Sequence, residues 1–320
     1  MPANAGIQAR WVSAMRRGDF VGAWAINDAV LASGGMPDDP RLPYHLRFVW
    51  DGRPFDGLHV VVRCYHGLGD TIQFARYLPA LRRRTASVTL ETQRELVPLL
   101  QSIPGVDQLV PFRAAAPIPR GERDLEIMEL SHALRLGPVG GAYLSVPTDM
   151  DQTRRRLGGG RLIGLCCTAG DWDGERSVPA VELAPTLRIP RLRLVRLQRS
   201  AGAPLSWVNP EDRLEDLLQT ATLVAACDLI ITVDTMIAHL AGAMGRPVWL
   251  LLKADADWRW MTGRNDSPWY PTMRLYRQAR PGDWSVPLAH IANDLAGWAG
   301  IRHGRDEAQV VQESLSFTPD

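Results

Sequence analysis

The chain has 320 residues, a net charge of +1 at pH 7, 46% hydrophobic residues and 22% charged residues. This balance gives no electrostatic reason to expect nucleic acid or an anionic membrane as a partner, and no apolar run approaches the roughly 18 residues of a membrane span. Its four cysteines show no CxxC spacing, and its start lacks the features of a secretory signal. We therefore expect a cytoplasmic protein with reduced thiols and no zinc site.

The first segment, residues 9–33, carries hydrophobic residues at helical spacing on either side of a Gly18-Asp19 turn. This pattern predicts a short helical hairpin that resembles the middle of one tetratricopeptide repeat. A single repeat cannot bury its own hydrophobic face. We therefore expect residues 1–36 to form a helical cap that packs on another part of the chain, followed by a proline-rich linker at residues 37–57.

From His59 onward, short apolar runs alternate with helical patterns. The first series predicts strands at residues 59–64, 87–90, 108–110 and 125–130, with helices at 71–84 and 95–101. Pro79 should kink or shorten the first of these helices. We expect this series to form one Rossmann-like domain, residues 58–150, and the arginine- and glycine-rich residues 147–160 to connect it to the next.

A second alternating series begins at Arg161. It predicts strands at residues 162–167, 192–197, 229–233 and 247–252, and helices at 214–226, 235–244 and 286–298. Two such series argue for an α/β protein with two Rossmann-like, doubly wound parallel sheets that face a cleft. The second domain is expected at residues 151–300, and residues 301–320 read as a flexible polar tail.

The most informative motif is residues 234–239, which read Asp-Thr-Met-Ile-Ala-His. They follow an apolar strand and open a predicted helix, where free backbone N–H groups and the helix dipole favour an anion. His239 lies four residues after Thr235, so both should project from one face of the helix. Together with Asp234 they suit a diphosphate. A threonine N-cap beside a packed histidine would produce the same pattern.

The first strand leads into a second candidate turn, which contains Gly67, Gly69, Asp70 and Thr71. Two glycines allow the backbone to approach a phosphate or acceptor closely. The third glycine of a dinucleotide fingerprint is missing, so a nicotinamide oxidoreductase is the weakest candidate. Asp70 either caps the helix or acts as a general base at the carboxyl end of the first strand.

Other polar residues are weaker candidates. Arg176, Gln198, Arg199 and Lys253, the single lysine of the chain, could approach a phosphate. Asp-x-Asp triplets at residues 149–151, 171–173 and 255–257 could hold a divalent cation, although chance pairs of aspartates are expected in loops. The aromatic residues of segments 258–260 and 267–271 suit a sugar ring or base, and they also suit a domain interface.

Taken together, these motifs resemble bacterial GT-B glycosyltransferases related to the heptosyltransferases of glycosyltransferase family 9. The chain is most similar to members that carry tetratricopeptide repeats, which in turn resemble O-linked N-acetylglucosamine transferases. The resemblance covers residues 44–296. Its matching segments are Trp-Asp-Gly-Arg-Pro at 50–54, Gly-Leu-Gly-Asp-Thr-Ile-Gln-Phe-Ala-Arg-Tyr-Leu-Pro at 67–79, residues 233–242, Asp-Trp-Arg-Trp at 257–260 and Asp-Ser-Pro-Trp-Tyr-Pro at 266–271.

The resemblance implies an inverting, metal-independent transfer from a nucleotide-diphosphate sugar, ADP-heptose-like or UDP-linked, with no other cofactor. The acceptor would be a hydroxyl of a glycan, a lipopolysaccharide or a protein. The base of the family falls on Asp70, and its donor-diphosphate residues fall on Asp234, Thr235 and His239. A sugar-nucleotide epimerase of the same build and a degenerate binding module remain as alternatives. The oligomeric state is open.

One segment departs from the family pattern. Where relatives carry a Trp-Ala-Gly-Asn-like loop and then a basic, asparagine-containing run, residues 166–177 read Cys-Cys-Thr-Ala-Gly-Asp-Trp-Asp-Gly-Glu-Arg-Ser. Arg176 and Ser177 match that pattern, but the acidic residues before them would repel a phosphate. Residues 253–256, Lys-Ala-Asp-Ala, likewise replace a more usual run of apolar residues and proline.

Overall fold

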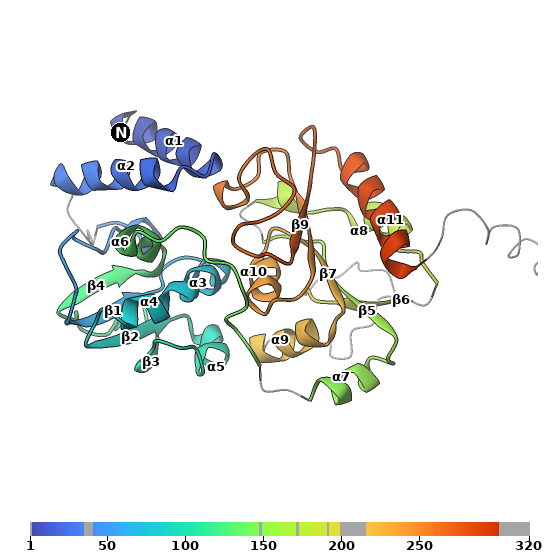
Figure 1. Ribbon diagram of the computed structural model, residues 1–320, viewed down its shortest axis with the longest axis horizontal. Helices are drawn as coiled ribbons and strands as arrows, with labels where there is room; N and C mark the ends of the chain where they lie inside the picture. Colours follow the sequence, from blue (N-terminus) through green and yellow to red (C-terminus); the bar gives the residue numbers. More distant parts are fainter. Residues whose placement is uncertain are drawn as a thin grey trace, which may run out of the picture.

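The computed structural model describes residues 2–34, 41–146, 149–170, 173–190, 192–198 and 216–300. These residues form two parallel sheets that lie in separate halves of the molecule, with a helical hairpin against them (Figure 1). The predicted α/β class, with two parallel sheets and an N-terminal hairpin, is confirmed. The polar tail predicted at residues 301–320 lies outside the part of the chain that the structure describes.

The first sheet has the strand order β3-β2-β1-β4. Its strands are β1 (His59–Arg63), β2 (Ser87–Thr92), β3 (Gln108–Pro111) and β4 (Arg123–Glu126). The short helices of this half are η1 (Tyr44–Leu46), α3 (Leu68–Phe74), η2 (Ala75–Tyr77), α4 (Leu78–Arg82), η3 (Arg94–Leu96), α5 (Val97–Leu100), η4 (Ile127–Glu129) and α6 (Leu130–Leu134). All three strand pairings are parallel, so the carboxyl ends of β1 and β4 meet at one edge.

The helix expected at residues 71–84 is interrupted as predicted. Pro79 occupies the first turn of α4, where a missing N–H costs nothing, and the short helix η2 separates α4 from α3. The expected strand at 125–130 is shorter than predicted and gives way to η4 and α6 after Glu126.

The second sheet has the order β6-β5-β7-β8-β9. Its strands are β5 (Arg161–Cys166), β6 (Leu192–Arg196), β7 (Leu229–Val233), β8 (Val248–Leu252) and β9 (Met273–Arg277), and its helices are α8 (Ala180–Thr186), η5 (Gly174–Arg176), α9 (Leu217–Ala226), α10 (Met236–Ala243), η6 (Trp258–Trp260) and α11 (Ser285–Ala299). Strand β9 and helix α8 were not predicted. Helix α7 (Met150–Arg156) forms inside the expected connection, so the proposed domain boundary at residue 151 falls within a helix.

The hairpin consists of α1 (Pro2–Arg16) and α2 (Phe20–Ala32). Asp19 caps α2 by accepting a hydrogen bond from the Gly22 N–H at 2.8 Å. The hairpin contacts the second half, where Trp11 meets Trp258 edge to face at 5.1 Å. It also contacts the first half, where His132 Nε2 lies 2.8 Å from Asp28 Oδ1. The rest of the chain therefore supplies the partner surface that a single repeat requires.

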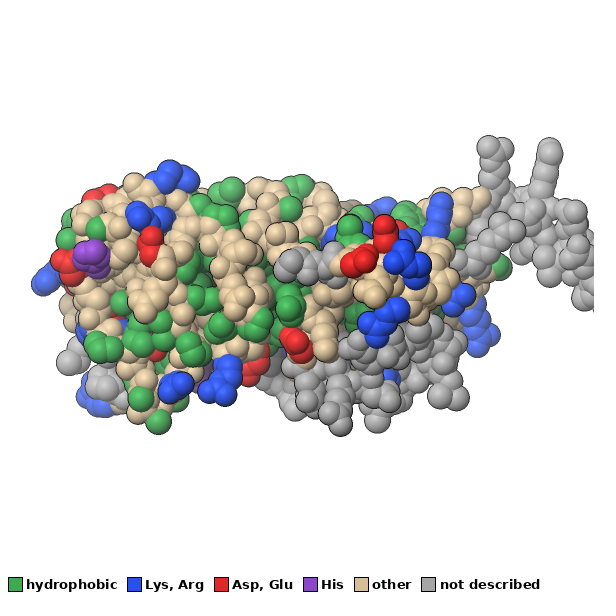
Figure 2. All heavy atoms as spheres, turned by 90° about the horizontal axis from the view of Figure 1, so that it is seen from below, with side chains coloured by type: hydrophobic (Ala, Val, Ile, Leu, Met, Phe, Trp, Pro, Cys, Tyr) green, Lys and Arg blue, Asp and Glu red, His purple; other side chains and the backbone are tan. Residues whose placement is uncertain are grey.

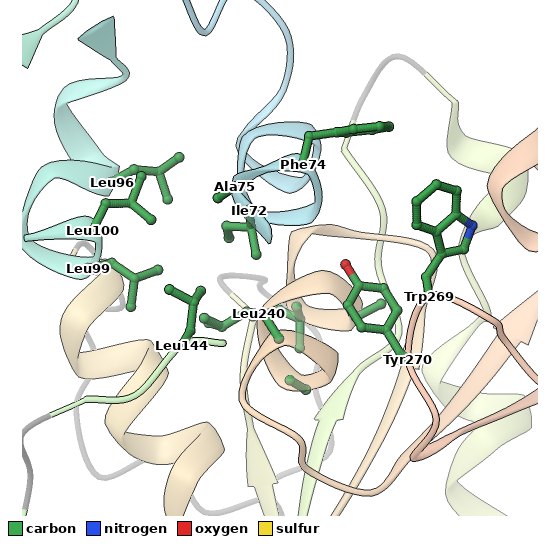
Figure 3. Close-up of a cluster of buried hydrophobic side chains, with 14 of the residues drawn as sticks. Ile72, Phe74, Ala75, Leu96, Leu99, Leu100, Leu144, Leu240, Trp269 and Tyr270 are labelled. Carbon is green, nitrogen blue, oxygen red and sulfur yellow. The ribbon is translucent and has the colours of Figure 1, made fainter. Parts of the chain in front are cut away.

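The two halves share one continuous hydrophobic core. Figure 3 shows side chains of α3, among them Ile72 and Phe74, facing Leu240 of α10 and the aromatic pair Trp269 and Tyr270. Among the described residues, no helix combines the length and the apolar composition that a membrane crossing requires. On the face shown in Figure 2, basic and acidic side chains lie interspersed among hydrophobic ones, in keeping with the small net charge.

Candidate active site

Asp70 lies in the first turn of α3, directly after the loop at the carboxyl end of β1. Its Oδ2 accepts a hydrogen bond from the Gly67 N–H at 3.0 Å, so it does cap the helix. Its Oδ1 forms an ion pair with Nη2 of Arg259 at 2.5 Å. The two sequence-based interpretations of Asp70 are therefore compatible, because one carboxylate oxygen serves the cap and the other meets a cation from the second half.

Arg259 is one residue of this site that the sequence motifs did not identify. Its side chain is buried, and it donates from Nε to Gln73 Oε1 at 2.9 Å and from Nη1 to Asp257 Oδ1 at 2.8 Å, besides its contact with Asp70. Burial lowers the pKa of this guanidinium, but Asp70 and Asp257 outweigh burial and raise it. The available signal was the Asp-Trp-Arg-Trp segment, for which only an aromatic role was considered.

The starts of α3 and α10 lie directly against each other. A Cβ atom at Gly69 would lie 2.8 Å from Cδ2 of His239 and 3.5 Å from Cα of Met236. The Gly-Asp turn of the first half and the Asp-Thr turn of the second half are therefore neighbours, as the family resemblance implies.

His239 is a packed residue in this arrangement. Its Nδ1 lies 2.9 Å from the Tyr270 hydroxyl, and its ring stacks on Trp260 at a centroid distance of 5.3 Å. Burial, and then the nearby cations Arg259, Arg76 and Arg176, hold the pKa of His239 well below its ordinary value. The imidazole is therefore neutral at pH 7. These contacts match the packed-histidine interpretation, and a role in donor binding stays a prediction.

Asp234 and Thr235 occupy the junction between β7 and α10. Asp234 is buried, and burial, reinforced by Asp257, raises the pKa of its carboxyl to about 6. Thr235 is the N-cap residue of α10, yet its side chain makes no capping hydrogen bond within the described structure. Its Oγ1 lies 3.5 Å from Thr232 Oγ1 instead. The α10 amides are thus left without a side-chain cap, which suits an anion.

Arg176 lies beside this junction, because its Nη1 donates to the Asp234 carbonyl at 2.7 Å. The acidic residues before it are paired. Asp173 Oδ2 lies 3.0 Å from Lys253 Nζ and 3.6 Å from Arg176 Nε, and Glu175 Oε2 lies 3.2 Å from Lys253 Nζ. The two departures from the family pattern therefore face each other, and Lys253 offsets the acidic charge that would repel a phosphate.

Two further candidates have internal roles. Gln198 accepts hydrogen bonds from the Cys167 and Thr168 N–H groups and donates to Thr168 Oγ1, which ties the end of β6 to the end of β5. Thr71 is fully buried and donates to Gln93 Oε1 at 3.0 Å. Arg199, also a candidate, lies outside the described residues.

A histidine–carboxylate pair that we did not predict lies at the same sheet edge. His66 Nδ1 is 2.9 Å from Glu126 Oε1, which joins the carboxyl ends of β1 and β4. Burial lowers the pKa of His66, but Glu126 and then Asp70 outweigh it, and the pKa is raised despite an opposing effect of Arg259. His66 therefore shares the electrostatic environment of Asp70 and Arg259.

The aspartate triplets do not gather into a metal site in the described part of the chain, where no group of three or more potential ligands lies close enough to hold an ion. Asp149 caps α7, Asp255 pairs with Arg16, and Asp257 pairs with Arg259. Residues 171–172 of the remaining triplet lie outside the described structure.

Comparison with known proteins points in the same direction as these motifs. The model of the family described as "Glycosyltransferase family 9 (heptosyltransferase)" matches residues 214–255, the segment that contains the Asp-Thr turn and α10. Among curated proteins, Protein FlbA of Caulobacter vibrioides is 26% identical over 289 residues, which cover 78% of this chain and 48% of FlbA. The chain thus spans about half the length of this relative.

Two solved structures show the fold. The ADP-heptose lipopolysaccharide heptosyltransferase II of E. coli aligns with a TM-score of 0.51 and 15% identity, over 75% of this chain and 98% of that one. A family 9 glycosyltransferase of Veillonella parvula aligns with a TM-score of 0.50 and 12% identity, over 78% of this chain and 98% of its own. The fold is therefore that of the GT-B heptosyltransferases. The resemblance to tetratricopeptide-linked relatives stays a prediction.

Proposed function

We propose that this chain is a glycosyltransferase that moves a sugar from a nucleotide-diphosphate donor, ADP-heptose-like or UDP-linked, to a hydroxyl of a glycan, lipopolysaccharide or protein acceptor. The observation that carries the proposal is the contact between the two turns, in which Gly69 abuts the first turn of α10 and Asp70 pairs with Arg259. A carboxylate of one half therefore lies beside the helix start of the other. The family match over residues 214–255 supports the same assignment.

In this proposal the transfer is inverting and needs no metal. Asp70 accepts the proton of the acceptor hydroxyl as that oxygen attacks the anomeric carbon. The diphosphate leaves with the bonding electrons, and its charge is stabilised by the α10 amides, Thr235 and Arg176. Asp234 shapes the junction, and His239, Gln198 and Arg199 remain proposed donor-side residues. Gly67 and Thr71 fix the loop that presents Asp70.

The base assignment is tested with Asp70→Asn. An asparagine oxygen can still accept the Gly67 N–H, so we expect the variant to fold and bind nucleotide while turnover falls by at least about 100-fold, the lower range of general-base contributions. Turnover is measured as nucleotide release from a panel of ADP- and UDP-sugars. Asp266→Asn is the matched control, because Asp266 forms an exposed pair with Arg264.

Normal turnover of Asp70→Asn would show that the base lies elsewhere. If calorimetry detects no binding of any ADP- or UDP-sugar to the wild-type chain, the transferase proposal fails, and a non-catalytic binding module is the better description. Conversion of a donor without any acceptor would instead identify an epimerase. The cytoplasmic location stays a prediction.

A further inference from the structure

Each of the three side-chain nitrogens of Arg259 contacts a carboxylate or amide oxygen, and Nη2 also lies 3.8 Å from Sδ of Met128. Nε donates to Gln73 and Nη1 donates to Asp257, and these two contacts anchor one edge of the guanidinium group. Nη2 donates to Asp70 Oδ1. A change of partner at Nη2 alone therefore requires only a small movement, because the other two nitrogens can keep their contacts.

The charge of Arg259 also acts on titratable side chains at the start of α10. Its charge lowers the pKa of Asp234, partly offsetting the rise caused by burial, and it lowers the pKa of His239 in the same direction as burial. Trp260, the next residue, stacks on His239. Arg259 thus acts electrostatically on both turns, and its guanidinium forms ion pairs with Asp70 and Asp257.

We propose that Arg259 exchanges Asp70 for the diphosphate when a donor binds at the start of α10. This inference rests on the proposed function and adds a residue and an order of events to it. Without a donor, the guanidinium holds Asp70 in an ion pair. With a donor, Nη2 binds a phosphate oxygen, and Asp70 Oδ1 is released to accept a proton.

Such an exchange links donor binding to the availability of the base. Guanidinium groups bind phosphate and carboxylate oxygens with similar geometry, so the two acceptors compete for the same N–H group. Because Asp70 and the diphosphate compete for one donor, weakening the Asp70 contact should strengthen diphosphate binding, at most by the factor by which that contact is weakened. The arrangement makes Asp70 available as a base only while the donor occupies the site.

The test measures the affinity of the full chain for ADP, UDP and inorganic pyrophosphate by calorimetry. In Asp70→Asn, the amide nitrogen no longer accepts from Arg259, and we expect each ligand to bind about 5- to 10-fold more tightly, the lower end of typical coupling between two sites. In Arg259→Lys, binding should weaken at least about 10-fold. Asp266→Asn should leave the affinity within about twofold, because Asp266 pairs with Arg264 at an exposed position.

The double variant Asp70→Asn/Arg259→Lys separates an exchange from a general charge effect. Removal of a negative charge tightens anion binding whatever the cation, whereas an exchange needs Arg259. We therefore expect the tightening by Asp70→Asn to disappear when Arg259 is replaced. Thermal unfolding verifies that each variant is folded, and Arg259→Gln replaces the lysine variant if that variant does not fold.

Two results would overturn the inference and leave the transferase proposal intact. One is wild-type binding of nucleotide diphosphate together with unchanged or weaker binding by Asp70→Asn. The other is a tightening of equal size in the presence and absence of Arg259. Failure of the wild-type chain to bind any of the three ligands would instead remove the proposed function itself.

Discussion

Gly69 of α3 and His239 of α10 are in contact where the two halves of the molecule meet. A Cβ atom on Gly69 would approach Cδ2 of His239 to 2.8 Å, which is closer than side chains pack. The missing side chain therefore allows α3 to approach α10. The sequence predicts that this glycine lets the backbone approach a ligand. In the structure it also brings the two turns of the candidate site together, and its contact with a ligand stays a prediction.

Substitution of Gly69 by alanine should separate the turns. His239 cannot move freely, because it stacks on Trp260 and contacts Tyr270, so the strain passes to the helices. We expect Gly69→Ala to lower the free energy of unfolding by about 1–3 kcal/mol, as overpacked interiors do, and to reduce turnover more than Asp266→Asn does. Urea unfolding and nucleotide release measure the two effects.

Gly297→Ala is the control for this substitution. Gly297 also lies in a helix, α11, but nothing lies within 4 Å of the position that its Cβ would take. This variant should be unchanged or more stable by about 0.5–1 kcal/mol, because alanine favours the helix. If Gly69→Ala behaves like Gly297→Ala, the contact between α3 and α10 is not tight in solution.

A strand or helix is predictable where the hydrophobic pattern of its sequence matches its burial in the folded chain. The buried apolar run Leu229–Val233 forms β7, and it leads into the Asp-Thr turn as expected. Strand β9 (Met273–Arg277) was missed because it alternates apolar residues with Arg274 and Arg277, and so lacks the continuous apolar run of an interior parallel strand.

The sequence identifies individual residues of the site more readily than the residues that they contact. Asp70 was identified by its place after a strand, but its partner Arg259 lies 189 residues further along the chain. Similarly, Lys253 and Glu175 are 78 residues apart and meet only because β8 and β5 belong to one sheet. Local spacing carries no information about such contacts, which depend on how the sheets assemble.

Lys253 should matter for donor binding rather than for stability. Its side chain pairs with Asp173 and with the exposed Glu175, and partly exposed pairs of this kind contribute about 0–1 kcal/mol. Lys253→Met should therefore change the free energy of unfolding little. Nucleotide-diphosphate affinity should fall about 3- to 10-fold, because the charge of Asp173 then acts on Arg176 and on the phosphate alike.

A second substitution tests whether the effect passes through Asp173. In Asp173→Asn/Lys253→Met, the carboxylate that Lys253 neutralises is gone, and we expect affinity to return to within about twofold of wild type. Glu175→Gln removes the other, exposed acid and should have little effect. Equal losses in the single and the double variant would mean that Lys253 contacts the ligand directly and is not mainly a neutralising partner.

The buried carboxyl of Asp234 predicts a pH dependence of stability with a definite sign. Burial raises its pKa from 3.8 to about 6, so between these values the folded chain keeps a proton that the unfolded chain has released. The resulting stabilisation is complete below pH 3.8 and is lost as the pH rises through 6. It amounts to at most about 3 kcal/mol, at 1.36 kcal/mol for each pH unit between the two values.

Asp234→Asn removes this titration and resembles the protonated carboxyl in shape. The free energy of unfolding of the variant, measured with urea from pH 4.5 to 7.5, should therefore rise relative to that of the wild type as the pH increases, and the difference should level off above pH 7. His239 and other buried groups titrate in both proteins, so the difference isolates Asp234. Parallel curves would mean that the carboxyl keeps its ordinary pKa.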